Sequence, residues 1–167
     1  YQAVSYLIQQ GHRKIAVLGG PATSHPSMMR RQGAQQAMED AGIRFEDKLY
    51  GLSNYDFESA YHAMNGLLAR RAEFTALFAM SDVIAFGAIR ALVSAGLRVP
   101  EDVSVIGFDG ITMSRYCVPV MTTIVQPSEQ IALQSIELLV RQIEHGTPAQ
   151  TVTLQPELQQ GESVRAI

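Results

Sequence analysis

The side chains best suited to chemistry follow four short apolar runs of the sequence. The runs end at Gly19, Leu52, Met80 and Phe108. The polar and aromatic residues that come after them are Ser24, His25, Arg30, Tyr55, Asp56, Ser81, Asp82 and Asp109. An ionised carboxylate accepts paired hydrogen bonds from vicinal hydroxyls, such as those of a sugar. The set indicates a binding site for a small polar molecule.

The same residues do not form a recognisable catalytic or metal-binding pattern. The four histidines, His12, His25, His62 and His145, are scattered, and no pair has the spacing of metal ligands. The sequence has no GxSxG motif, and Cys117 has no base beside it. We therefore expect no enzyme, no metal and no cofactor. A small α/β enzyme that uses Asp82, Asp109 and His25 is the alternative.

Each candidate also has a purely structural interpretation. Arg30 is expected in the first turn of a helix, where it opposes the helix dipole; this hints at a ligand, although a solvated arginine is as consistent. Asp82 begins a helix, so a stabilising acid in the first turn is the favoured interpretation. Asp109 ends a strand with no helix close behind it, which strengthens a ligand role. The glycines at 19–20 match neither GxGxxG nor a P-loop, so phosphate binding is weakly indicated.

Strands and helices alternate along the first two thirds of the chain. Short apolar runs predict strands over residues 14–19, 47–52, 75–80 and 102–108. Amphipathic stretches predict helices over residues 1–10, 27–41, 58–70 and 82–95. Strands that are apolar throughout are buried on both faces, which is typical of a parallel sheet. The pattern predicts a three-layer α/β fold, a parallel sheet flanked by helices, with ligands beyond the carboxyl ends of the strands.

The pattern changes after Phe108. The elements expected there are, in order, a loop over 109–121, a strand over 122–126, a helix from Pro127 to about His145, a strand over 151–154 and a weakly strand-like end over 157–167. The helix has a broad apolar stripe, and such a stripe promotes association when it is exposed.

Composition narrows the classes of function. The chain has 167 residues, enough for about one domain, and 47% of them are apolar. The net charge of -3 disfavours nucleic-acid binding by this segment. A single cysteine excludes an intrachain disulfide, and we expect a cytoplasmic location. No apolar run approaches the roughly 20 residues of a membrane span, so no membrane partner is expected. The first residue, Tyr1, suggests processing or a piece of a longer protein.

Several segments, read in order, resemble the effector-binding domain of the lactose-repressor/galactose-repressor family of bacterial transcription regulators. They are YLIQQGHRKIAVLGGP, RRQGAQQAMEDAGI, YDFESAY, TALFAMSDVIAFGAIRALVSAGLRVPEDVSVIGFDG and PVMTTIVQP. The resemblance implies one lobe of a type I periplasmic-binding-protein-like fold. It implies a C-terminal lobe over 1–125, a crossover helix and strand over 126–154 that belong to an N-terminal lobe, and a return segment over 155–167.

The resemblance also implies roles for individual residues. Those expected to bind the effector are Arg30, Tyr55, Ser81 and Asp109; further pocket candidates are Ser24, His25 and Asp82. The family often has Asn where this chain has Ser81, and a second acid where it has Gly110. Gly161 also replaces an arginine of the family pattern. These departures leave the identity of the effector open.

The family assembles as dimers through this lobe. The residues that match its contact positions are Phe86, Ile89, Arg90, Arg115 and Tyr116, although Phe86 fits a core position equally. The implied partners are a sugar or polyol effector, a second copy of the chain, and operator DNA contacted through a domain before Tyr1. A solute-binding protein of a transport system is the alternative function.

Overall fold

The structure, a computed structural model, describes residues 1–146 and 148–167. One six-stranded sheet has the order β2-β1-β3-β4-β5-β6. The strands are β1 (Ile15–Gly19), β2 (Tyr50–Leu52), β3 (Ala76–Ala79), β4 (Ser104–Asp109), β5 (Thr122–Val125) and β6 (Glu157–Gln159). The first five are parallel, and β6 runs antiparallel to β5. The predicted α/β class is confirmed, with one antiparallel strand added at the edge.

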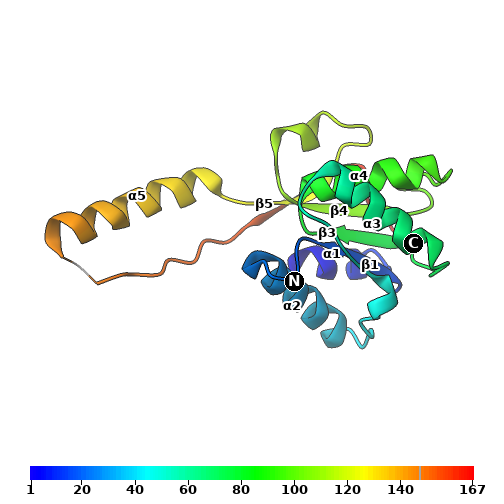
Figure 1. Cartoon of the computed structure of the whole chain (residues 1–167), viewed down its shortest axis with the longest axis horizontal. Helices are drawn as coiled ribbons and strands as arrows, with labels where there is room; N and C mark the ends of the chain where they lie inside the picture. The colour runs from blue at the N-terminus through cyan, green and yellow to red at the C-terminus, as the bar shows by residue number, and fades with distance from the viewer. Residues whose placement is uncertain (147) are drawn as a thin grey trace.

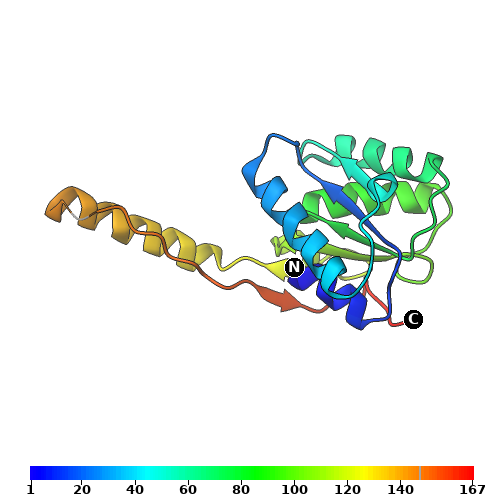
Figure 2. The same ribbon diagram turned by 90° about the horizontal axis from the view of Figure 1, so that it is seen from below.

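Helices cover both faces of the sheet. They are α1 (Gln2–Gln9), α2 (His25–Asp40), α3 (Phe57–Ala69) and α4 (Asp82–Ser94). The helix α5 (Ser128–His145) lies away from the sheet (Figure 1), and η1 (Asp47–Leu49) and η2 (Thr112–Arg115) are short 3-10 turns. Figures 1 and 2 show α1 and α2 together on one face, and α3 and α4 together on the other. All residues of β1 and β3 are buried, because both faces of these strands are covered.

The strand order places a ligand crevice between β1 and β3. The chain moves from β1 outward to β2 and then returns to the other side of β1 to form β3. The loops after these two strands therefore diverge to opposite faces of the sheet. In open α/β sheets such a reversal leaves a crevice at the carboxyl ends of the strands. Gly19 and Met80 mark that edge.

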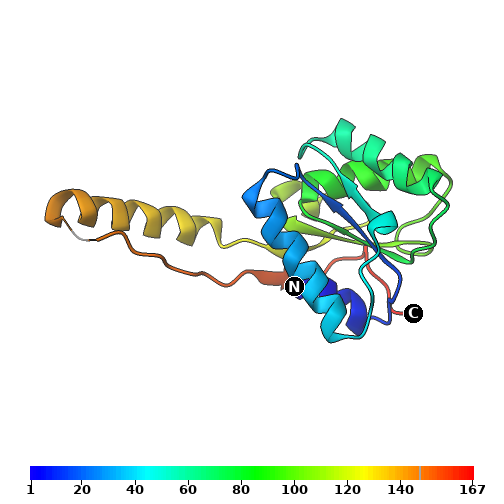
Figure 3. The same cartoon turned by 60° about the horizontal axis from the view of Figure 1, so that its bottom comes forward.

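A long arm extends from the globular body, as Figure 3 shows. It consists of α5 and the segment 148–156, which returns beside the helix without strand structure. No residue of α5 is buried. Leu138 is half-buried. The other large apolar side chains of α5 are 41–74% exposed: Ile131, Leu133, Ile136, Leu139, Val140 and Ile143. The predicted helix is confirmed, and its apolar stripe has no cover within the part of the chain that the structure describes.

Several predicted elements need correction. Residues 151–154 do not form a strand, because they have no neighbouring strand with which to pair. Only 157–159 of the last segment forms one, and 47–49 is a 3-10 turn instead of the start of β2. Arg30 lies in the second turn of α2, not the first, since the helix begins at His25 and accommodates Pro26 at its start. Among the described residues, no helix has the length and hydropathy needed to cross a membrane.

Candidate functional site

Three polar side chains converge at the carboxyl edge of the sheet. Arg30 from α2 and Gln126, just after β5, both reach Asp109 at the end of β4. Arg30 Nη2 lies 3.4 Å from Asp109 Oδ1, and Gln126 Nε2 donates to the same oxygen at 2.7 Å. The Arg30 guanidinium also lies 3.9 Å from the centroid of the Phe108 ring and donates to the Met80 carbonyl. The predicted proximity of Arg30 and Asp109 is present in the structure.

Both the carboxyl pKa and the backbone conformation of Asp109 depart from their ordinary values. Burial raises the pKa of its carboxyl, and the Arg30 charge acts against this increase. Its backbone has φ of +111°, a conformation that a side chain resists, and Gly110 follows with φ of +72°. A Cβ on Gly110 would lie 2.7 Å from the side chain of Val125, so only glycine fits beside β5. Backbone strain of this kind clusters at ligand-binding sites, which makes Asp109 a candidate ligand residue.

Tyr55 lies in the turn between β2 and α3, also with a positive φ, +61°. Its ring packs against the backbone of Gly20, since a Cβ there would lie 2.1 Å from Tyr55 Cε2. The Tyr55 hydroxyl is buried and has no hydrogen-bond partner among the described residues. Asp56, next to it, caps α3 by accepting from the Ser59 amide at 2.7 Å. A buried hydroxyl without a partner is an available contact for a ligand or a water molecule.

Ser81 and Asp82 follow β3 and are both buried. The Ser81 hydroxyl caps α4 by accepting from the Ile84 amide at 3.2 Å. Asp82 is in the first turn of α4, as expected, but its carboxylate accepts hydrogen bonds from outside that helix. The donors are the Ile111 amide at 2.9 Å and the Thr123 hydroxyl at 2.6 Å. Burial raises the pKa of Asp82, and these two hydrogen bonds oppose the increase.

The remaining pocket candidates lie at the start of α2. Ser24 is half-buried in the cap position and makes no capping hydrogen bond, and His25 is exposed. The sequence interpretation missed Ser27, which is buried and donates to the Gly20 carbonyl at 3.2 Å, and Gln126. Gln126 is the polar residue at the carboxyl end of the fifth parallel strand. Gln126 follows β5 in the same way as the other candidates follow the first four strands, and this position is the signal that identifies it.

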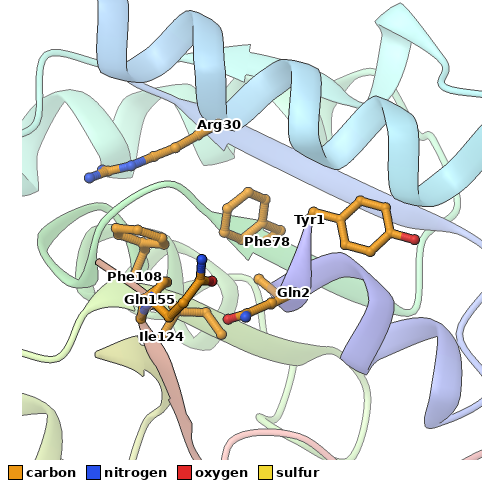
Figure 4. A pocket seen from close by; sticks show the side chains of 9 residues that line it. Tyr1, Gln2, Arg30, Phe78, Phe108, Ile124 and Gln155 are labelled. Atoms are coloured by element: carbon orange, nitrogen blue, oxygen red, sulfur yellow. The ribbon is translucent and has the colours of Figure 1, made fainter. Parts of the chain in front are cut away.

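A cavity of about 340 Å³ lies beside the polar cluster, between the sheet and α1. Figure 4 shows Arg30 at its upper side, with Phe78, Phe108 and Ile124 from the sheet and Gln2 and Gln155 opposite. Arg30 borders both this cavity and the Asp109 cluster, whereas the other three predicted effector-binding residues, Tyr55, Ser81 and Asp109, do not line the cavity. The cavity is mostly apolar with a few polar groups, as small-molecule sites are. Within the described ranges, no group of three or more His, Cys, Asp or Glu side chains could hold a metal ion.

The five interface candidates occupy two places. On α4, Phe86 and Ile89 are half-buried and Arg90 is exposed. The Phe86 ring lies 6.3 Å from that of Phe57, which is 57% exposed, so an aromatic pair borders the outer side of α4. After η2, Tyr116 is 78% exposed. Arg115 Nε donates to Gln159 Oε1 of β6 at 3.1 Å.

Comparison with known proteins agrees with this geometry. Residues 4–164 match the periplasmic binding protein-like domain family. Two similar relatives are proteins named HTH-type transcriptional repressor PurR. The one from Histophilus somni is 37% identical over 100% of this chain and 50% of its own length. The one from Photorhabdus laumondii is 39% identical over 98% and 48%. The chain thus spans about half the length of the curated relatives it matches.

Solved structures lead to the same family. A sugar-binding transcriptional regulator of the LacI family from Escherichia coli, complexed with phosphate, superposes with a TM-score of 0.92 at 34% identity, over 99% of this chain and 60% of that one. The transcriptional regulator CelR in complex with cellobiose superposes with a TM-score of 0.93 at 36% identity, over 97% and 50%. These regulators favour a regulatory over a transport or enzymatic function. The chain belongs to the periplasmic binding protein-like domain family, in the form found in the effector-binding domains of LacI-type transcriptional regulators.

Proposed function

We propose that this chain is the C-terminal effector-binding lobe of a cytoplasmic bacterial transcriptional repressor. The observation that supports this most is the cluster at the end of β4, where a backbone-strained carboxylate, Asp109, meets Arg30 and Gln126 in a periplasmic binding protein-like domain. Operator DNA would be contacted by a separate domain, because the net charge of this lobe is -3. The effector would act by binding one conformation of the protein more tightly than another.

The proposed effector is a small sugar or polyol. Asp109 would accept hydrogen bonds from vicinal hydroxyls, and Arg30 would donate to the same molecule. The 3.4 Å separation of Arg30 and Asp109 is long for a charge-assisted hydrogen bond, so both groups retain capacity for a ligand. The Phe108 ring lines the cavity and has Arg30 over one face, and its remaining apolar area would contact the carbon side of a sugar. Tyr55 would contact the sugar from the turn between β2 and α3. Ser81 would contribute by donating its O–H, since a hydroxyl that accepts from the Ile84 amide can still donate.

We further propose that the crossover helix and the segment after it, over 126–154, belong to a second lobe, with 155–167 returning to this one. The exposed apolar stripe of α5 supports this, because an exposed stripe of this size is covered by a partner in most proteins. The effector would then bind between the two lobes and close them. The globular body over 1–125 holds the polar cluster itself, apart from Gln126.

The lobe is also proposed to form a homodimer. The surface would combine the outer side of α4, with Phe86, Ile89 and Arg90, and the end of η2, with Arg115 and the following Tyr116. Support comes from the exposure of Tyr116 and from the Phe57–Phe86 pair, which places apolar area at the surface beside α4. Aromatic and arginine side chains are the residues that most often dominate interface energy.

Calorimetry of the full-length protein with a panel of sugars, including cellobiose, tests the proposed function. Arg30→Ala and Asp109→Ala should each weaken binding by about 10- to 150-fold, because each removes a hydrogen bond to a charged group worth roughly 1.5–3 kcal/mol. Arg13→Ala and Asp47→Ala are matched controls on exposed residues away from the edge, and should bind as wild type does. Binding of wild-type strength by both site variants would refute the assignment.

A further inference from the structure

The buried carboxylate of Asp82 lies directly beneath the strained segment that carries Asp109. Asp82 is 0% exposed, and both of its oxygens accept hydrogen bonds, at 2.9 Å and 2.6 Å. One donor is the amide of Ile111, two residues after Asp109. The other is the hydroxyl of Thr123 on β5, the strand that pairs with β4. Asp82 therefore links the start of α4 to the end of β4 and to β5.

The fold makes special room for this carboxylate. A Cβ on Gly107 of β4 would lie 2.2 Å from Asp82 Oδ1, closer than any real contact. Only glycine at this position lets the carboxylate lie against the strand. A carboxylate that is wholly buried is costly unless hydrogen bonds compensate it, and a first-turn acid needs no burial to stabilise a helix. The location of Asp82 is thus explained by what it holds and not by the helix that it begins.

The hydrogen bonds continue from Ile111 into the exposed turn η2. The carbonyl of Ile111 accepts from the Ser114 amide at 2.9 Å and from the Ser114 hydroxyl at 2.7 Å. The Ser114 carbonyl in turn accepts from the Met121 amide at 2.9 Å, just before β5. Arg115 and the exposed Tyr116 follow Ser114. One residue, Ile111, therefore joins Asp82 on its amide side to the η2 segment on its carbonyl side.

We propose that Asp82 is a positioning residue, which fixes the Asp109 carboxylate at the ligand edge and ties it to the exposed segment 112–116. The inference rests on the proposed role of Asp109 in effector binding. The positioning role requires that the side chain of residue 82 accept from the Ile111 amide and form a hydrogen bond with the Thr123 hydroxyl. Asparagine meets both needs, since its carbonyl accepts from Ile111 and its NH₂ donates to the Thr123 oxygen. Alanine meets neither.

Hydrogen–deuterium exchange of the full-length protein without any sugar tests the anchoring. In Asp82→Ala, amides of the segment 110–116 should exchange at least about 10-fold faster, while those of β1 and β3 keep their wild-type rates. Asp82→Asn should restore slow exchange. Thr123→Val, which removes one of the two bonds and preserves side-chain shape, should accelerate the same segment by a smaller factor. Unchanged exchange in 110–116 for both Asp82→Ala and Thr123→Val overturns the proposal, and so does equal acceleration throughout the sheet.

Sugar affinity then tests whether Asp82 acts through Asp109. With cellobiose, or any other sugar of the panel that binds, Asp82→Ala should weaken affinity at least about 10-fold and Asp82→Asn less than about 3-fold. Asp82→Ala should cause no further loss in the Asp109→Ala background. Additive losses, or equal losses for the Asn and Ala variants, overturn the proposal. If Asp109→Ala binds as wild type does, or no sugar binds, the proposed function fails, and exchange alone decides the role of Asp82.

Discussion

Replacing Gly107 by alanine is a severe test of how closely the site is packed. The added Cβ would lie 2.2 Å from Asp82 Oδ1, 3.3 Å from Asp82 Cγ and 3.4 Å from Thr123 Oγ1. The oxygen must move by about 1 Å to reach an ordinary contact, and its 2.6 Å hydrogen bond from Thr123 cannot survive that movement. The neighbours leave little room for relaxation, because Asp82 and Thr123 are 0% exposed.

Two contributions determine how much Gly107→Ala should lower the free energy of unfolding. Loss of a hydrogen bond to a charged group costs about 1.5–3 kcal/mol, and overpacking of a core costs about 1–3 kcal/mol. We expect Gly107→Ala to lower the free energy of unfolding by about 2.5–6 kcal/mol, measured by urea unfolding followed by circular dichroism. Sugar binding should weaken together with stability, since Asp82 moves away from the Asp109 segment.

Gly66→Ala is the matched control. Gly66 lies inside α3, and a Cβ there would meet nothing within 4 Å. Alanine should therefore stabilise the protein by about 0.5–1 kcal/mol through its helix propensity. If Gly107→Ala stays within about 0.5 kcal/mol of wild type, the close approach of Asp82 to β4 is not a feature of the protein.

Buried His12 accepts from the Thr75 hydroxyl and donates to the Arg165 carbonyl, and burial lowers the pKa of its imidazole. The contribution of His12 to the free energy of unfolding should be constant well above pH 6.5 and fall below it, because the unfolded chain takes up the proton first. Urea midpoints measured from pH 7.5 to 4.5 should therefore fall less in His12→Asn than in wild type. Ile136→Glu with Leu139→Glu, on the exposed stripe of α5, should lower the melting temperature of the full-length protein by several degrees, whereas Glu137→Gln should not; no change in the first variant would contradict a covered stripe. Tyr116→Arg should shift the sedimentation profile from dimer toward monomer, whereas an unshifted profile would remove Tyr116 from the interface.

Much of the fold could be predicted because each element has a strong local pattern. The runs at β1 and β3 are wholly apolar, and burial on both faces leaves no other interpretation. Arg30 and Asp109 could be assigned to one edge because parallel strands end together. The strand predicted over 151–154 is wrong, because alternation of apolar and polar residues indicates only a capacity for strand pairing. Pairing needs a second strand, which the described part of the chain does not supply.

The details of the site could not be predicted for a related reason. The role of Asp82 depends on Gly107, Thr123 and Ile111, which are distant in sequence and meet only once the sheet forms. A first-turn acid on α4 looks the same in sequence whether it faces solvent or lies beneath β4. The cavity beside Arg30 likewise combines Gln2 with Gln155 from opposite ends of the chain.

A crystal structure of the full-length protein with a bound sugar from the panel would show directly whether Asp109 and Arg30 bind the effector. We expect sugar hydroxyl oxygens within about 3.2 Å of the Asp109 carboxylate and of the Arg30 guanidinium. We also expect the Asp82 bonds to Ile111 and Thr123 to remain in place. A sugar bound away from the end of β4, with Arg30 and Asp109 contacting only each other, would contradict the proposed function.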